Sequence, residues 1–141
     1  ISMIEKKYNY IFENDNSITI QKSKDGHFYL PLKINDLEII FLVDTGASRS
    51  LLSKKDFKLV NNSNIFLPAE TILETANGIV VAKEIIFHDV KVFEYNLGET
   101  SFLVADKNFK GPRISLLGLD LLNNKFKYEI TNYYLKLQIF P

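Results

Sequence analysis

The sequence has no cysteine and only two histidines among its 141 residues. The absence of cysteine excludes disulfides, thiol nucleophiles and cysteine-based zinc sites. The two histidines, His27 and His88, are isolated and lack the spacing of metal ligands. Basic and acidic residues number 17 each, so there is no excess of positive charge to attract nucleic acid or an anionic membrane. We therefore expect no metal, no cofactor and no nucleic-acid partner.

Long apolar runs are also missing. None approaches the roughly 18 residues needed to cross a bilayer, and the chain does not begin with a signal-peptide pattern. Residues 1–16 are polar and rich in asparagine apart from an aromatic stretch at 8–12, so we expect an N-terminal arm or linker there. The remaining residues, 17–141, have the length of one ordinary domain with a single core. We expect the chain as given to be a soluble domain.

Helical patterns are scarce, and short β-rich runs take their place. Turn signals separate these runs at 24–26, 35–36, 77–78 and 88–89. The runs expected to be strands are 17–21, 27–34, 37–41, 71–75, 79–86, 90–95, 101–104 and a final alternating series that passes through 128 and 134 to 140. Ser53 resembles an N-cap, which predicts a short helix at 54–60. Many short strands with little helix predict an all-β barrel or sandwich.

One acid occupies a position where an acid is costly. Asp44 follows directly after an apolar run, within the stretch LVDTGAS at 42–48. Desolvating a carboxylate costs free energy unless hydrogen bonds or a function compensate, and Gly46 allows the backbone to turn and approach that carboxylate. Two such carboxylates about 3 Å apart would share one proton. Such a pair can activate a water and protonate a substrate carbonyl, which cleaves peptide bonds without a metal, a thiol or a covalent intermediate.

Four stretches follow one another in the order found in a known family. They are GHF at 26–28, FLVDTGAS at 41–48, ETANG at 74–78, and LLG at 116–118 followed by leucines at 121 and 122. Together they resemble the retropepsin-like aspartic proteases, above all the bacterial single-domain branch that is typically membrane-anchored and includes rickettsial members. The resemblance covers about residues 17–140. It implies an all-β, retropepsin-like acid-protease barrel with one or two short helices and one lobe per chain. It also implies an N-terminal anchor in the bacterial membrane that precedes this chain.

The resemblance implies a role for each matching position. Asp44 would be the catalytic acid and base. Thr45 would hydrogen-bond to the active-site loop of a partner chain, and Gly46 would lie close to the substrate backbone. The active-site loop would continue through Ala47. A β-hairpin flap would close over the substrate, with a tip formed by Thr75, Ala76, Asn77, Gly78 and Ile79. A structural floor beneath the Asp44 loop would be formed by Leu116, Leu117 and Gly118.

The mechanism needs two Asp-Thr-Gly loops, and the chain has one. The resemblance therefore implies an obligatory homodimer, in which each subunit gives one Asp44 to a site on the two-fold axis. The substrate would be a polypeptide, bound as an extended strand between flap and floor. Apolar pockets lined by Ile79, Val80 and Leu117 would favour apolar or aromatic side chains near the scissile bond.

The dimer contacts of the family carry over only in part. Viral members place acids after the alanine of Asp-Thr-Gly-Ala and an arginine after the later glycine, and this ion pair braces their dimer. Here those places hold Ser48, Arg49 and Leu119, so the brace is expected to be absent, and Arg49 could contact substrate or pair with another acid. Residues 134–140 are a candidate for the terminal strands that interleave in the family's dimers. The aromatics from 126 to 140 fit a packed sheet or a dimer seam better than base stacking.

Two other functions are compatible with parts of this pattern. The chain could be a catalytically silent retropepsin-fold module that binds peptides or dimerises, although such a binder has no need of an intact Asp-Thr-Gly. The spacing of Asp44, Gly46 and Ser48 also occurs in the phosphate loop of actin-like ATPases and sugar kinases. That fold needs two lobes and more than twice this length, so the sequence favours the protease.

Overall fold

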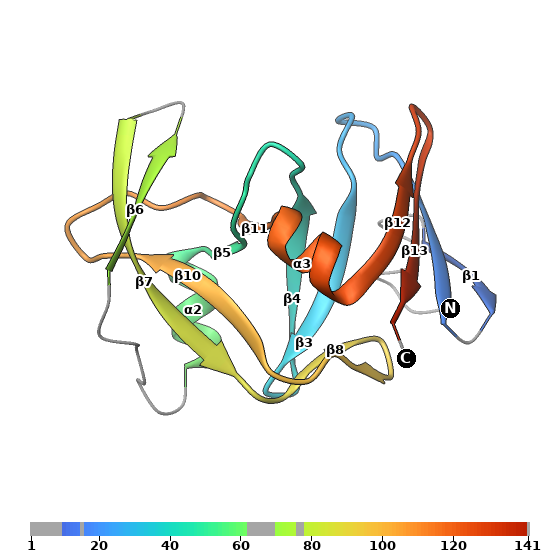
Figure 1. Cartoon of the computed structure of the whole chain (residues 1–141), viewed down its shortest axis with the longest axis horizontal. Helices are drawn as coiled ribbons and strands as arrows, with labels where there is room; N and C mark the ends of the chain where they lie inside the picture. The colour runs from blue at the N-terminus through green and yellow to red at the C-terminus, as the bar shows by residue number, and fades with distance from the viewer. Residues whose placement is uncertain (1–9, 15, 62–69, 76–77, 141) are drawn as a thin grey trace.

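The computed structural model describes residues 10–14, 16–61, 70–75 and 78–140, and in this part the chain forms two β-sheets and two short helices (Figure 1). The larger sheet contains, in spatial order, β6 (Glu70–Thr75), β7 (Gly78–Phe87), β10 (Thr100–Ala105), β5 (Leu51–Leu52), β11 (Ser115–Leu117), β4 (Leu37–Val43), β3 (Tyr29–Ile34), β8 (Val90–Val92) and β9 (Tyr95–Asn96). The smaller sheet contains β1 (Tyr10–Asn14), β2 (Ser17–Gln21), β13 (Tyr134–Ile139) and β12 (Phe126–Ile130). The helices are α2 (Lys54–Val60) and α3 (Leu119–Lys125). The predicted all-β class with one or two short helices is confirmed.

The hairpin of β3 and β4 leads the chain to Asp44. Its two turn residues, Asn35 and Asp36, both have left-handed backbone angles, with φ of 51° and 66°. A two-residue turn of this kind matches the right-handed twist of the strands that it joins. β4 pairs with β3 on one side and in parallel with β11 on the other. Because β4 is an interior strand, the position at which it ends is fixed from both sides.

Helix α2 begins and ends where the sequence predicts. The side chain of Ser53 accepts a hydrogen bond from the backbone N–H of Asp56 at 3.1 Å, as an N-cap does. The buried hydroxyl of Ser115 donates to the Asp56 carboxylate at 2.7 Å and accepts from the backbone N–H of Ser53 at 2.9 Å. These bonds fasten the start of the helix to β11.

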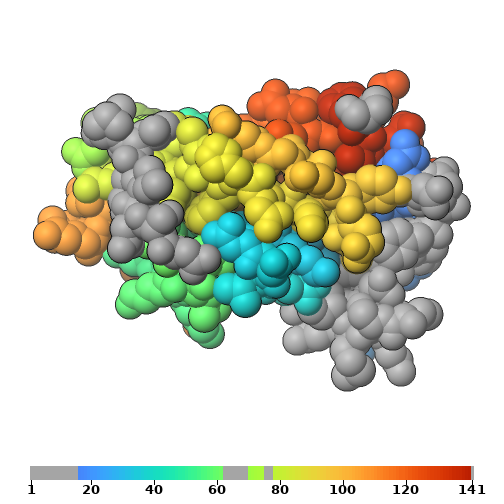
Figure 2. Space-filling view, turned by 90° about the horizontal axis from the view of Figure 1, so that it is seen from below, coloured from blue at the N-terminus to red at the C-terminus, as the bar shows by residue number. Residues whose placement is uncertain are grey.

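The predicted single strand at 90–95 is wrong. Its residues form a small hairpin, in which β8 ends at Val92 and pairs with Tyr95 of β9. Phe93 lies in the turn with a φ of 54°, a left-handed conformation that ends an extended strand. The sequence from 90 to 95 contains no glycine, proline or asparagine, so nothing in it signals this turn. In the view from below, β8 and β9 lie beside the turn that joins β3 to β4 (Figure 2), where the Asn35 N–H donates to the Asp89 carbonyl at 3.0 Å.

The smaller sheet differs from the expected arrangement of the terminal strands. β13, the candidate for exchange between subunits, pairs with β2 on one edge and with β12 on the other, within the same chain. It is therefore an interior strand with both edges filled. The expected boundary between arm and domain falls inside this sheet, since β1 pairs with β2. Residues 1–9 lie outside the described part of the chain.

One hydrophobic core joins the two sheets. Ile18 and Ile20 of β2 belong to the same buried cluster as Phe41 of β4 and Phe102 of β10, whose rings stack 5.4 Å apart. The chain is therefore one lobe in its described residues. Neither helix of that part is long or apolar enough to span a bilayer.

Candidate active site

Asp44 lies at the first turn after β4, and its own loop orients its carboxylate. The Asp44 N–H donates to the Leu117 carbonyl at 2.9 Å, and the Asp44 carbonyl accepts from the Ala47 N–H at 3.2 Å. The carboxylate atom Oδ1 accepts from the Gly46 N–H at 2.9 Å. A Cβ at position 46 would lie 3.2 Å from that oxygen, tighter than most such contacts, so glycine suits this position. Asp44 is partly buried, whereas Thr45 and Gly46 are exposed.

The segment 116–118 lies directly against this loop. Leu117 of β11 is fully buried and aligned with Val43 of β4. At Gly118, a Cβ would lie 2.7 Å from the carbonyl oxygens of both Ala47 and Arg49, closer than real Cβ atoms come to any neighbour. Any larger residue would therefore push the Asp44 loop away. The expectation that Leu117 lines the substrate pocket is wrong: it faces the core, and its partly exposed neighbour Leu116 lines the cleft.

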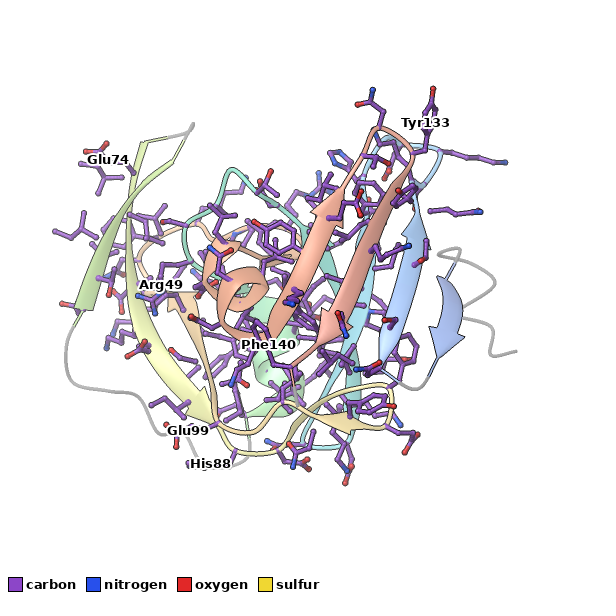
Figure 3. All side chains as sticks on the ribbon, turned by 45° about the vertical axis from the view of Figure 1, so that its right-hand side comes forward. Arg49, Glu74, His88, Glu99, Tyr133 and Phe140 are labelled. Carbon is purple, nitrogen blue, oxygen red and sulfur yellow. The ribbon has the colours of Figure 1, made fainter. Side chains whose placement is uncertain are left out.

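Arg49 bridges two acids that the sequence reading did not assign to the site. Its guanidinium lies 2.7 Å from the Glu84 carboxylate on β7 and 3.5 Å from the Asp120 carboxylate on α3. Figure 3 shows Arg49 beside β7. The interpretation that Arg49 pairs with an acid is confirmed. Within one chain, an ion pair therefore joins the Asp44 loop to the start of α3.

Ser50 completes this network beneath the loop. Its hydroxyl, fully buried, donates to Asp120 Oδ1 at 2.6 Å and accepts from the Gly118 N–H at 2.8 Å. The Ser50 N–H donates to Asp120 Oδ2 at 3.1 Å. On the other side of Arg49, the Ser101 hydroxyl donates to Glu84. That bond, and then the guanidinium, hold the pKa of Glu84 below its ordinary value of 4.5, while burial opposes the shift.

The hairpin of β6 and β7 stands over the other side of the site (Figure 1). The two strands pair antiparallel from Glu70 opposite Lys83 to Thr75 opposite Gly78, as the turn signal predicts. Gly78 has a φ of 110°, which favours glycine. Ala76 and Asn77, the predicted flap tip, lie outside the described residues. Figure 3 shows Glu74 near the upper end of β6.

A cleft of about 1000 Å³ joins Asp44 to this hairpin. It contains three groups of residues. The Asp44 loop provides Asp44, Gly46, Ala47, Ser48 and Arg49; the hairpin provides Leu73, Glu74, Ile79 and Val80; and the rest of the lining consists of Leu51, Phe109, Lys110, Gly111, Pro112, Arg113 and Leu116. Residues 107–113 are a loop, as predicted, but no signal in the sequence places them in the cleft. Thr45, Leu117 and Gly118 do not line the cleft: Thr45 is exposed, whereas Leu117 and Gly118 are buried against the Asp44 loop.

The cleft contains the oriented carboxylate of Asp44 and is lined by both apolar and charged side chains. A single carboxylate can take or give one proton, whereas peptide hydrolysis by a shared-proton dyad needs a second acid. Among the described residues, Glu74 is the other acid that lines this cleft, but it lies within β6 and no other acid there belongs to an Asp-Thr-Gly loop. Nor do those residues contain three histidine, aspartate or glutamate side chains grouped to hold a metal.

The comparisons with solved structures agree with this geometry. The chain is similar to a retropepsin-like aspartic protease from Rickettsia conorii, with 32% identity and a TM-score of 0.71, over 88% of this chain and 100% of that one. It is also similar to the EIAV protease bound to an inhibitor, with 22% identity and a TM-score of 0.59, over 72% of this chain and 90% of that one. The second likeness shows the fold alone.

Sequence comparisons point the same way. Over 117 residues the chain is 41% identical to an uncharacterised protein of Rickettsia prowazekii (strain Madrid E), and over 111 residues it is 27% identical to an uncharacterised Sinorhizobium protein from the cobV 5′ region. These matches cover 78% and 79% of this chain, but the chain spans about half the length of both relatives, 46% and 47%. The family model described as "gag-polyprotein putative aspartyl protease" matches residues 30–124. With an Asp-Thr-Gly loop set on a glycine floor, the chain belongs to the retropepsin-like aspartic protease family.

Proposed function

We propose that this chain is one half of an aspartic endopeptidase, and that two copies form the active dyad. One observation carries the proposal: each chain provides a single oriented carboxylate, Asp44, at the base of a cleft large enough for a peptide segment. A shared-proton mechanism needs two such carboxylates. A second copy, related by a two-fold axis, supplies the same group in the same environment.

The reaction then follows from the protonation state of the pair. Two carboxyl groups about 3 Å apart hold one proton between them, because both cannot ionise easily. The ionised group takes a proton from a water as the water oxygen bonds to the substrate carbonyl carbon, and the other group donates its proton to the carbonyl oxygen. The tetrahedral diol then breaks its C–N bond as the leaving nitrogen takes a proton from one carboxyl group of the dyad, and a hydroxyl of the diol gives its proton to the other carboxylate. The pair returns to its starting state with one proton.

The cleft also favours a class of substrate. Ile79, Val80 and Leu116 give it an apolar wall next to Asp44, which suits apolar or aromatic side chains beside the scissile bond. Lys110 and Arg113 add positive charge to the lining of the cleft, which favours an acidic residue further along the peptide. An extended peptide between hairpin and floor would place its alternate side chains toward these walls.

The experiment is cleavage of a peptide library at several pH values, with and without an inhibitor of aspartic proteases. We expect cleavage that peaks at mildly acidic pH, because one proton must stay on the dyad. Asp44→Asn should abolish cleavage and keep the fold. Asp36→Asn is the matched control: it makes the same chemical change in the exposed turn at the other end of β4, where asparagine is also favoured.

The library decides between the protease and the silent binding module. A module that only binds peptides would hold library members equally well before and after the Asp44→Asn substitution and would cleave none. Full cleavage by purified Asp44→Asn would instead remove Asp44 from the mechanism and contradict the proposal.

For the full-length protein we propose an N-terminal anchor in the bacterial membrane. The support is the resemblance to the membrane-anchored bacterial branch of the family. Fractionation of cells that express the full-length protein tests it: we expect the protease in the membrane fraction until detergent is added, and recovery in the soluble fraction without detergent would overturn it.

A further inference from the structure

A second pocket lies apart from the active-site cleft, between α2 and the larger sheet. Its volume is about 600 Å³, within the range of pockets that hold small molecules. Among the described residues, none lines both this pocket and the cleft. Lys83 lines the pocket, whereas the next residue of β7, Glu84, faces Arg49 in the cleft. Because successive residues of a strand point to opposite faces, the pocket lies on the other face of β7.

One face of α2 lines this pocket. Lys54, Phe57 and Lys58 have the spacing that places helical residues on a common face, and all three belong to the lining. The ring of Phe57 also packs against the hydrophobic core. The Lys54 ammonium donates to the Lys107 carbonyl at 3.4 Å, which links α2 to the segment after β10 (Figure 1). The helix thus presents an aromatic ring together with two ammonium groups.

The sheet adds apolar surface and more positive charge. Val104 of β10 lies directly opposite Lys83 of β7, so both side chains lie on the same face of the sheet. Val104 and Ala105, which follow each other at the end of β10, are buried. Lys107 follows after the strand and is exposed. The lining therefore combines a buried apolar part with lysine side chains.

Positive charge is concentrated in this pocket, although the whole chain has 17 basic and 17 acidic residues. Four lysines and one acid, Asp106, line it, which leaves a surplus of three positive charges. Asp106 lies 3.7 Å from the Lys83 ammonium. In the described part of the chain, Lys58 and Lys107 have no ion-pair partner. Glu70 lies opposite Lys83 on β6 but does not line the pocket. An anion in the pocket would offset the repulsion between these lysines.

We propose that this pocket binds a small phosphate monoester that carries an apolar or aromatic group. A phosphate monoester has a charge of about −1.5 to −2 at neutral pH, which matches the surplus better than the single charge of a carboxylate. Lysine binds phosphate as a point charge, without the two-pronged geometry of arginine. The apolar group of the ligand would pack against Phe57 and Val104. This binding does not depend on peptide cleavage.

One segment of the chain joins the pocket to the cleft. Asp106 and Lys107 line the pocket, and residues 109–113 line the cleft. The Phe109 N–H donates to the Asp106 carbonyl at 2.8 Å, so a turn connects the two parts. A ligand bound at Lys107 would restrain the pocket end of this segment. The ligand would then be an effector of the protease, and this consequence rests on the proposed function, whereas the binding itself does not.

The first measurement is calorimetric titration of the chain with phenyl phosphate at low ionic strength, where exposed charges are least screened. Inorganic phosphate has the charge without the apolar group, and benzoate has the ring with a single charge. We expect phenyl phosphate to bind roughly tenfold more tightly than either, because it alone uses both parts of the lining. Equal affinity for inorganic phosphate, or for benzoate, would overturn the proposed class of ligand.

Two double variants separate the pocket from the net charge of the chain. Lys58→Gln combined with Lys107→Gln removes two exposed charges from the lining, and phenyl phosphate should bind roughly tenfold more weakly. Lys55→Gln combined with Lys127→Gln is the matched control, since it removes two exposed charges outside the pocket. Thermal unfolding checks that both stay folded. Equal weakening in both variants would mean attraction by net charge and would overturn the site.

Amide chemical shifts in NMR spectra locate the bound phenyl phosphate. We expect the largest changes at Lys58, Ala105 and Lys107, which line the pocket. The cleft also contains two cations, Lys110 and Arg113. If the largest changes occur there, the phosphate binds in the cleft and the pocket is not its site.

Competition and cleavage complete the test. If hexaglutamate displaces phenyl phosphate at lower concentrations than unlabelled phenyl phosphate does, the pocket is a site for acidic polypeptide and the small ligand is wrong. A change in kcat/KM on adding phenyl phosphate, absent in the double variant of Lys58 and Lys107, supports the effector role. Unchanged cleavage would overturn that role and leave the binding site in place. Binding by a chain that cleaves no peptide would contradict the proposed function alone.

Discussion

The floor of the cleft, around Ser50 and Gly118, and its roof, the hairpin of β6 and β7, are built in opposite ways. The floor is made of buried, fully hydrogen-bonded groups: Gly118 against two carbonyl oxygens, and Ser50 between Asp120 and the Gly118 N–H. The roof is a two-stranded hairpin that exposes large apolar side chains, with Ile72 69% and Ile79 62% exposed. β7 pairs with β10 from Ala82 to Phe87, whereas its residues from Gly78 to Val81 pair with β6 alone, and an isolated two-stranded hairpin is marginally stable. The chemistry thus lies on the rigid side, and the contacts that choose a substrate lie on the side that can adapt.

The largest expected effect is on the floor. Gly118→Ala would force a Cβ to within 2.7 Å of two backbone oxygens, so the Asp44 loop must shift. We expect a loss of about 2–4 kcal/mol in the free energy of unfolding, and loss of cleavage in the protein that remains folded. Denaturant unfolding measures the first and peptide cleavage the second. Gly98→Ala is the control, because its φ of 74° strains alanine but nothing lies within 4 Å of the new Cβ. It should cost about 1–2 kcal/mol and keep cleavage.

A smaller effect is expected at the ion pair between Arg49 and Glu84, whose contribution to the free energy of unfolding depends on pH. The Ser101 hydroxyl and the Arg49 guanidinium lower the pKa of Glu84 in the folded chain. A carboxyl group whose pKa is lower in the folded chain than in the unfolded chain stabilises the folded state. This contribution is fully present above pH 4.5, the ordinary pKa of the group, and is lost as the pH falls through the folded-state pKa. Glu84→Gln should therefore be destabilised by about 1 kcal/mol near neutral pH and lose that difference in strong acid. Unfolding curves of both proteins at pH 7 and pH 3 check this; a difference that grows in acid would contradict it.

The smallest effect on stability is expected at the roof. Ile79→Ser changes an exposed residue that lines the cleft, and should alter the free energy of unfolding by no more than about 0.5 kcal/mol. It should nevertheless lower kcat/KM about tenfold for peptides with apolar residues at the scissile bond, since a contact in the transition state is lost. Ile72→Ser is the matched control: Ile72 is similarly exposed but lies outside the cleft. Equal kinetic losses in both variants would mean that the hairpin acts through its general stability.

The parts of the fold that the sequence predicts are those governed by near neighbours in the chain. The turn at Asn35 and Asp36, the cap at Ser53 and the strand that ends at Asp44 each depend on a few adjacent residues. Each of these predictions is confirmed, because local backbone preferences and hydrogen bonds decide such features. The Asp-Thr-Gly motif that begins at Asp44 is likewise a pattern of adjacent residues.

What the sequence does not reveal depends on residues far apart. Arg49 meets Glu84 across 35 positions, and Ser50 meets Asp120 across 70, with no local pattern that links them. In the three-residue strand β11, a shift by one position decides whether Leu116 or Leu117 faces the cleft, and both are leucine. The pairing of β13 on both edges likewise follows from the sheet as a whole.

The claim that each chain holds half a site is tested most directly by dilution. Specific activity and the dimer fraction are measured on the same samples, from well above the dimer dissociation constant to well below it. We predict that specific activity falls in step with the dimer fraction and vanishes where only monomer is present. A constant specific activity in samples shown to be monomeric would contradict the account, because one Asp44 would then suffice.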